Sequence, residues 1–151
     1  MKIALGCDHG GYELKQFIMK TLEKLGYEYE DFGCYSLESC DYPDFGAAAA
    51  RAVAEGKCDR GIVICTTGIG ISIAANKIKG IRCAHCADCL EAEMTRRHNN
   101  ANVCTMPARF ISTDTAREIV DIFLNTEFEG GRHQARIDKI PLKNCGCGEK
   151  K

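Results

Sequence analysis

The 151-residue sequence lacks an excess of either charge, a long apolar run and a recognisable export signal. Twenty basic and twenty-one acidic residues give a formal net charge of −1, which provides no overall attraction for nucleic acid or an acidic membrane surface. The longest stretch without a charged residue, residues 61–76, contains three glycines and is shorter than the roughly 20 apolar residues that span a bilayer. Gly6 interrupts the short apolar run after Lys2, so no signal peptide is predicted. We therefore expect a cytoplasmic protein with neither nucleic-acid nor membrane partners.

The composition excludes a disordered, collagen-like or fibrous chain. Hydrophobic residues make up 45% and charged residues 27% of the sequence, close to the average of globular proteins. The length is that of one ordinary domain with a single core. We predict one domain over residues 1–143, followed by a flexible, cysteine-containing tail over residues 144–151.

Cysteine, in contrast, is abundant, with eleven residues. Their number is odd and the chain is long enough to form its own core, so mostly reduced thiols are expected rather than a disulfide scaffold. Cys86-x-x-Cys89, preceded by Cys83, is a possible half of a zinc or redox site, and Cys145-x-Cys147 lies in the tail. Because no second pair has the usual spacing, metal binding or a redox role ranks as a minor alternative.

Apolar patterning predicts an alternation of strands and helices. Strands are predicted over residues 2–7, 27–32, 61–65, 81–85 and 103–106, and helices over 12–25, 41–54, 71–77, 90–98, 113–124 and 131–140. This order indicates an α/β fold with a parallel sheet and right-handed crossovers. Ligands of such sheets bind beyond the carboxyl ends of the strands, where the strand order reverses. Cys7-Asp8-His9 and the segment from Cys65 to Gly70 are predicted to lie there.

The segment Cys65-Thr66-Thr67-Gly68-Ile69-Gly70 has two interpretations. Its glycines allow a tight turn that leaves backbone N–H groups free at a helix N-terminus, a site for an oxyanion or a phosphate. The same groups would favour the reactive thiolate form of Cys65. Alternatively, Cys65 is a buried structural residue before an ordinary turn. The segment matches neither a Walker A loop nor a dinucleotide-binding fingerprint.

Three further patterns are ambiguous when taken singly. Asp8-His9 is either a hydrogen-bonding pair in the same crevice or an ordinary turn. His98-Asn99 is either a polar helix end or the site of a proton shuttle. Arg132 and Arg136 lie one helical turn apart, which suits a phosphate but also a solvated basic face.

Taken together, the motifs resemble the ribose-5-phosphate isomerase B group, which includes subunits of galactose-6-phosphate isomerase. The resemblance extends to about Lys139. It rests on Gly6-Cys7-Asp8-His9-Gly10-Gly11, Asp41-Tyr42-Pro43, Gly61 to Cys65 continuing through Gly68 to Lys77, Gly80-Ile81-Arg82, Arg97-His98-Asn99 and Glu129-Gly130-Gly131-Arg132-His133.

The resemblance implies a Rossmann-like three-layer sandwich with a five-stranded parallel sheet. It also implies a homodimer, or alternatively a dimer of dimers, whose C-terminal helix reaches the partner subunit to complete shared active sites. Cys65 would be the base, Thr67 would assist proton movement, and His98 would open the sugar ring. The backbone of Thr66, Gly68, Ile69 and Gly70 would hold the enediolate, and Asp8, His9, Asn99, Arg109, Arg132 and Arg136 would contact the sugar phosphate. No metal or organic cofactor is implied.

Two positions depart from the family pattern. Thr66 stands where glycine usually follows the cysteine, and Pro107 replaces a residue that is usually small. The predicted function is the interconversion of ribose 5-phosphate and ribulose 5-phosphate, with a six-carbon phosphate such as galactose or allose 6-phosphate as the alternative. A cysteine-rich redox or metal-binding protein without catalysis is the remaining hypothesis.

Overall fold

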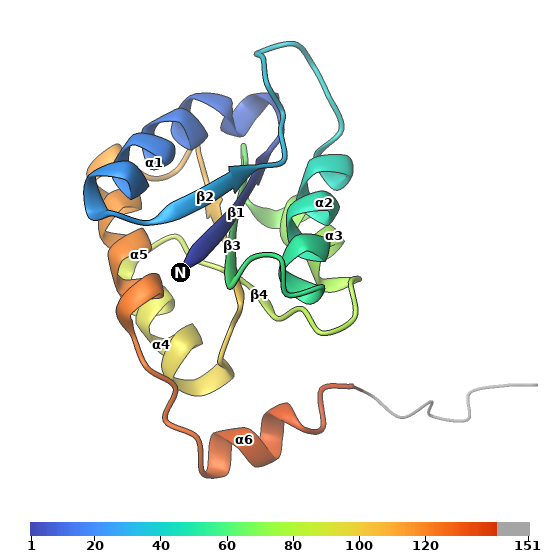
Figure 1. Ribbon diagram of the computed structural model, residues 1–151, viewed down its shortest axis with the longest axis vertical. Coiled ribbons are helices and arrows are strands. Elements are labelled where there is room, and N and C mark those ends of the chain that lie inside the picture. The colour runs from blue at the N-terminus through green and yellow to red at the C-terminus, as the bar shows by residue number, and fades with distance from the viewer. Residues whose placement is uncertain (142–151) are drawn as a thin grey trace, which may run out of the picture.

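The computed structural model describes residues 1–141, so the predicted tail, with Cys145 and Cys147, lies outside the described residues. Its centre is a five-stranded sheet in which every neighbouring pair is parallel (Figure 1). The strands are β1 (Lys2–Cys7), β2 (Glu28–Asp31), β3 (Arg60–Cys65), β4 (Cys83–His85) and β5 (Val103–Pro107), in the order β2-β1-β3-β5-β4. The predicted parallel sheet is confirmed.

Helices cover both faces of this sheet. They are α1 (Tyr12–Leu25), α2 (Tyr42–Ala54), α3 (Ile69–Asn76), α4 (Cys89–Asn99), α5 (Thr113–Asn125) and α6 (Arg132–Ile137), with a short 3₁₀ helix at His9–Gly11. Figure 1 shows α1, α4 and α5 on one side of the strands and α2 and α3 on the other, which confirms the three-layer α/β architecture. Within residues 1–141, no helix has the length and apolar character that a membrane crossing requires.

Successive side chains of each strand point into different cores, as the two-residue period of a strand dictates. Ile64 packs in the larger core beneath α1 and α5, and its neighbour Cys65 packs in the smaller core beneath α2 and α3. That smaller core contains Ile71 and Ala75 of α3. The sulfur of Cys65 is therefore on the side of the sheet that carries the following helix.

Three elements are shorter than their patterns predict. The strand predicted over residues 27–32 is confined to Glu28–Asp31. The strand predicted from Ile81 begins at Cys83, because the amide of Ile81 donates to Ile78 in a turn and that of Arg82 donates to the side chain of Asn102. The helix predicted to reach Ile140 ends at Ile137. Tighter bonds between residues three apart follow it, as expected close to a proline, which disfavours helical geometry in the residue before it.

The strand order reverses between β1 and β3, and the two strands are paired along most of their length. Asp8, which follows β1, donates its backbone N–H to the carbonyl of Ile64 at 3.2 Å. Asp8 and His9 are therefore held beside the end of β3, one residue from Cys65. This end of the sheet, where the strands finish, is the carboxyl end, and the opposite end is the amino end.

Lys15 of α1 is completely buried, which the helical pattern did not predict. Its Nζ donates to both carboxylate oxygens of Asp31, at 2.6 and 2.8 Å, and to the carbonyl of Cys34 at 2.6 Å. All three ammonium donors are thus satisfied, and the lysine joins α1 to the segment after β2.

Replacing Lys15 with methionine is expected to lower the free energy of unfolding by about 3 kcal/mol, because Asp31 and the Cys34 carbonyl lose their partner. Urea unfolding followed by circular dichroism measures this. Lys20→Met, at an exposed position of the same helix, serves as the control and should change stability by less than about 0.5 kcal/mol. Equal effects at the two positions would contradict a structural role for the buried lysine.

Candidate active site

Cys65 ends β3 and is 4% exposed. Its Sγ accepts a hydrogen bond from the backbone N–H of Gly68 at 3.1 Å. Gly68 has a φ of +73°, a left-handed conformation that glycine adopts readily, and its carbonyl accepts from Thr105 Oγ1 at 3.1 Å. The turn is thereby tied to β5 with one amide aimed at the sulfur. The structure thus puts the thiol beside one backbone donor of the turn that the sequence pattern indicated.

The two threonines after Cys65 are partly exposed and shape the turn. Thr67 Oγ1 accepts from the amide of Ile69 at 3.3 Å, and the Thr67 carbonyl lies 3.0 Å from His85 Nε2. The side chain of Thr66 occupies space left open by Gly10, since a Cβ at position 10 would overlap Thr66 Oγ1. The threonine that departs from the family pattern is therefore accommodated by a glycine on the neighbouring loop.

Asp8 and His9 are positioned by the same strand ends. The buried carboxylate of Asp8 caps the 3₁₀ helix by accepting from the Gly11 amide at 3.0 Å. His9 Nδ1 accepts from the amide of Cys40 at 3.2 Å, so in the neutral imidazole the proton is on Nε2. Nε2 is the ring nitrogen left to donate to a ligand.

Arg109 reaches this end of the sheet through β5. Cys65 is in register with Pro107, and the carbonyls of Cys65 and Thr66 accept from the amides of Ala108 and Arg109 at 3.0 and 3.1 Å. Proline has no N–H, but at the last position of the strand the next amide supplies the bond. The departure at Pro107 therefore leaves the exposed Arg109 at the carboxyl end, beside the cysteine turn.

The remaining predicted residues lie at the amino end of the sheet. His98 and Asn99 end α4, just before the chain enters β5, and the Asn99 carbonyl accepts from Arg82 at 3.0 Å. Arg132 and Arg136 are exposed on α6, which packs on α4 and lies beyond the N-terminal ends of the strands in Figure 1. β5 runs between the two ends of the sheet, and a strand of its length spans roughly 13 Å. One chain therefore holds its predicted site residues in two separate groups.

The amino-end group contains an ordered cluster around His98. Its ring stacks on that of His133, with centroids 4.3 Å apart and planes 10° apart. Glu129 Oε2 lies 3.9 Å from His98 Nε2 and 3.3 Å from His133 Nε2, and Arg97 binds the other carboxylate oxygen. The hydrogen bond from Arg97 lowers the pKa of Glu129, and burial lowers the pKa of His133.

A cavity of about 430 Å³ opens beside this cluster. It is lined by His98, Asn99, His133, Arg136, Ile137 and Ile140. The predicted site residues His98, Asn99 and Arg136 therefore line one cavity. The buried imidazole of His133 forms part of its wall.

Sequence reasoning missed four residues that shape the two groups. His85 covers the turn at Gly68, and the ring of Tyr42 lies against Gly70. Glu129 and His133 surround His98. Tyr42, Glu129 and His133 are within the motifs that carry the resemblance, which was the available signal, but their contacts come from distant segments.

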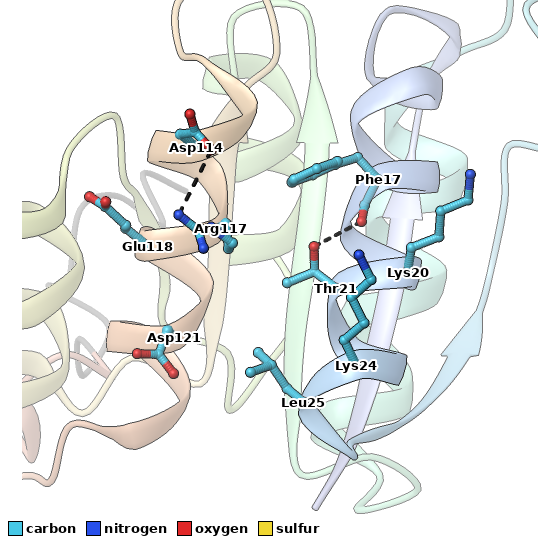
Figure 2. A pocket seen from close by; sticks show the side chains of 9 residues that line it. All are labelled: Phe17, Lys20, Thr21, Lys24, Leu25, Asp114, Arg117, Glu118 and Asp121. Carbon is cyan, nitrogen blue, oxygen red and sulfur yellow. Dashed lines mark hydrogen bonds and ion pairs between the residues drawn. The ribbon is translucent and has the colours of Figure 1, made fainter.

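A larger cavity than the one beside His98 lies between the outer faces of α1 and α5 (Figure 2). Its volume is about 650 Å³, and its walls carry mostly charged side chains, such as Lys20, Lys24 and Arg117. None of the predicted site residues lines it. Size alone therefore does not identify the site in this fold.

The cysteine cluster does not form a metal site in the part of the chain that the structure describes. All nine cysteines of residues 1–141 are free thiols. Burial raises the pKa of Cys83, and the thiol of Cys89 donates to Glu118 at 3.4 Å. Cys83, Cys86 and Cys89 are not among the groups of three converging ligand atoms found in residues 1–141. The pKa values of Cys83 and Cys89 are raised, which favours the thiol over the thiolate that binds metals, so the zinc alternative at this motif gains no support.

Comparison with known proteins extends these observations to most of the chain. The family profile described as Ribose/Galactose Isomerase matches residues 3–140. Ribose-5-phosphate isomerase B of Escherichia coli is 47% identical over 139 residues, covering 92% of this chain and 93% of that protein.

Solved structures of similar sequence share the fold of this chain. Ribose-5-phosphate isomerase B of Clostridium thermocellum superposes with a TM-score of 0.92 at 56% identity, covering 93% of this chain and 95% of the other. The enzyme of Mycoplasma genitalium, solved with bound ribulose 5-phosphate, has a TM-score of 0.88 at 42% identity, with coverage of 92% and 93%. The fold, the cysteine turn and the near-complete match lead to one conclusion: this chain belongs to the ribose/galactose isomerase family.

Proposed function

We propose that this chain is an aldose–ketose isomerase that interconverts ribose 5-phosphate and ribulose 5-phosphate. The observation that carries the proposal is the hydrogen bond from the Gly68 amide to Cys65 Sγ, at the point where the strand order reverses. Relatives named ribose-5-phosphate isomerase B, one of them with ribulose 5-phosphate bound, support this choice of substrate.

In the proposed reaction, the Cys65 thiolate removes the proton from C2 of the open-chain aldose and returns a proton to C1. The electron pair left on carbon is delocalised onto the carbonyl oxygen, which forms an enediolate. Backbone N–H groups of the turn from Thr66 to Gly70 stabilise this oxyanion, and one such donor is worth about 10²–10³ in rate. Thr67 moves the hydroxyl proton between the two substrate oxygens.

The other residues bind and prepare the substrate. His98 opens the sugar ring by proton transfer, and Asp8, His9 and Asn99 contact the hydroxyl groups. Arg109, Arg132 and Arg136 supply the cationic contacts for the phosphate. Binding at this remote group helps to position the reacting carbons.

The separation of the two groups supports a homodimer with shared sites. A small sugar phosphate cannot contact Cys65 and Arg136 of one chain when they lie at opposite ends of the sheet. A second copy that places its amino end against the carboxyl end of the first would bring them together. Ile69 and Ile73, one turn apart on α3, are 58% and 56% exposed, and such apolar surface is typical of an interface. A cytoplasmic location stays a prediction.

A substrate panel tests the proposal. We expect kcat/KM for ribose 5-phosphate to exceed that for allose and galactose 6-phosphates by at least about tenfold, because the Thr66 side chain fills the space beside Gly10 and leaves less room for a longer sugar. Thr66→Gly removes this side chain and should reduce the preference. A higher kcat/KM for a six-carbon phosphate in the unsubstituted protein would favour the alternative function instead.

A further inference from the structure

Three potential metal ligands converge where α4 meets α6. His98, Glu129 and His133 each offer one ligand atom, and these atoms all lie within 4.8 Å of one another. The residues come from the end of α4, the segment before α6 and the first turn of α6. The backbone joins these segments, because the amide of Glu129 donates to the Arg97 carbonyl at 3.1 Å.

His133 supplies a second observation that points to a ligand. The residue is 6% exposed, yet its Nε2 has no hydrogen-bond partner in the described structure. Glu129 Oε2 lies 3.3 Å away, but outside the direction that a hydrogen bond requires. Unpaired buried polar atoms are rare in folded proteins, and a missing ion is one of their recognised explanations.

We propose that His98, Glu129 and His133 form a binding site for a divalent transition-metal ion of the zinc class. Two imidazoles and one carboxylate are a set of ligands that zinc uses in proteins, with a fourth position left for water. Because His98 is also the proposed ring-opening residue, an ion bound there would inhibit the isomerase reaction.

The geometry needs a modest adjustment of one side chain. Zinc binds imidazole nitrogen at about 2.0–2.1 Å. Three atoms that are up to 4.8 Å from one another must therefore move closer together to share one ion. Glu129 and His133 are already 3.3 Å apart, whereas the stacked His98 ring has to rotate towards them. Its side chain is 37% exposed and therefore has room to do so.

Arg97 orients the carboxylate of Glu129. Its guanidinium binds Glu129 Oε1 through Nη2 at 2.5 Å and Nε at 2.6 Å, which leaves Oε2 facing the two rings. Groups of this kind, which orient a ligand without touching the ion, commonly alter metal affinity by about 10- to 100-fold when removed.

The test is a titration of the reduced, full-length protein with Co²⁺ alone, followed by absorbance and by calorimetry. We expect one ion per chain, with the absorption of nitrogen and oxygen ligation and without cobalt–thiolate charge-transfer bands. His133→Gln and Glu129→Gln should each weaken binding by at least about tenfold. Glu129 is partly exposed, so its variant keeps the test valid if the His133 variant misfolds.

The controls address the abundant thiols. Cys89→Ser and the pair Cys145→Ser and Cys147→Ser should leave the affinity for Co²⁺ unchanged. Thiolate bands, or binding that survives Glu129→Gln and is lost in a cysteine variant, would overturn the proposal, as would the absence of stoichiometric binding.

A second expected result, inhibition of the isomerase reaction by Zn²⁺, rests on the proposed function. Zn²⁺ should compete with the sugar phosphate, because the ion occupies the nitrogen with which His98 opens the ring. Binding without inhibition would support the metal site and contradict the role of His98. An active enzyme that binds no ion would overturn the metal site and leave the isomerase function standing.

Discussion

Replacing Cys65 with alanine is expected to lower kcat for isomerisation by at least about 10²–10⁴-fold, the contribution of a positioned base. Alanine gives the Gly68 amide no acceptor in place of the sulfur and has no group that can take the substrate proton. The decisive measurement is the exchange of the C2 hydrogen with solvent deuterium, followed by NMR. Exchange reports proton abstraction directly, even where later steps limit turnover.

A matched control separates chemistry from folding. Cys104, on the adjacent strand β5, is also a buried free thiol, but it carries no proposed role. Cys104→Ala should retain activity, and the two variants should show similar small losses in the free energy of unfolding. Undiminished C2 exchange in the Cys65→Ala protein would remove this residue as the base.

Mixing two inactive variants is expected to restore activity. One variant carries Cys65→Ala, and the other carries Arg132→Ala together with Arg136→Ala. In a mixed dimer, one site combines both defects and the other has neither. Half of randomly assembled dimers are mixed, so co-expression should recover about one quarter of the unsubstituted activity. The recovery follows from the position of the cysteine and the arginines at opposite ends of each chain.

Native mass spectrometry of the co-expressed sample shows whether mixed dimers form. If they form and the activity remains the sum of the two inactive proteins, the shared site is wrong. Co-expression of Cys65→Ala with Cys65→Ala/Lys20→Met is the control, because both partners lack the base and no assembly can restore a complete site.

The sheet was predictable from the sequence because its strands are marked locally. The apolar run of β3 and the amphipathic pattern of α5 are each contained in about a dozen residues or fewer. The errors occurred at β4 and α6, where bonds to Asn102 and within the turn before Pro141 decide the boundaries. Such contacts involve residues outside the local segment, so the apolar periodicity of that segment cannot predict them.

The site divides in the same way. The proximity of Cys65 and Asp8-His9 was predictable, because short segments at the ends of neighbouring strands carry these residues. The stack of His133 on His98, the His85 contact with the turn and the burial of Lys15 all join segments far apart in the chain. No spacing rule predicts which distant side chains meet.

The sequence by itself determined the alternation of elements and the position of Cys65 directly before a glycine-containing turn, because these depend on interactions between near neighbours. Only the tertiary structure decided that the cysteine and the arginines lie at opposite ends of the sheet, and that Nε2 of His133 is buried with no hydrogen-bond partner within residues 1–141. Those outcomes depend on strand order and helix packing, in which residues distant along the chain compete for the same space.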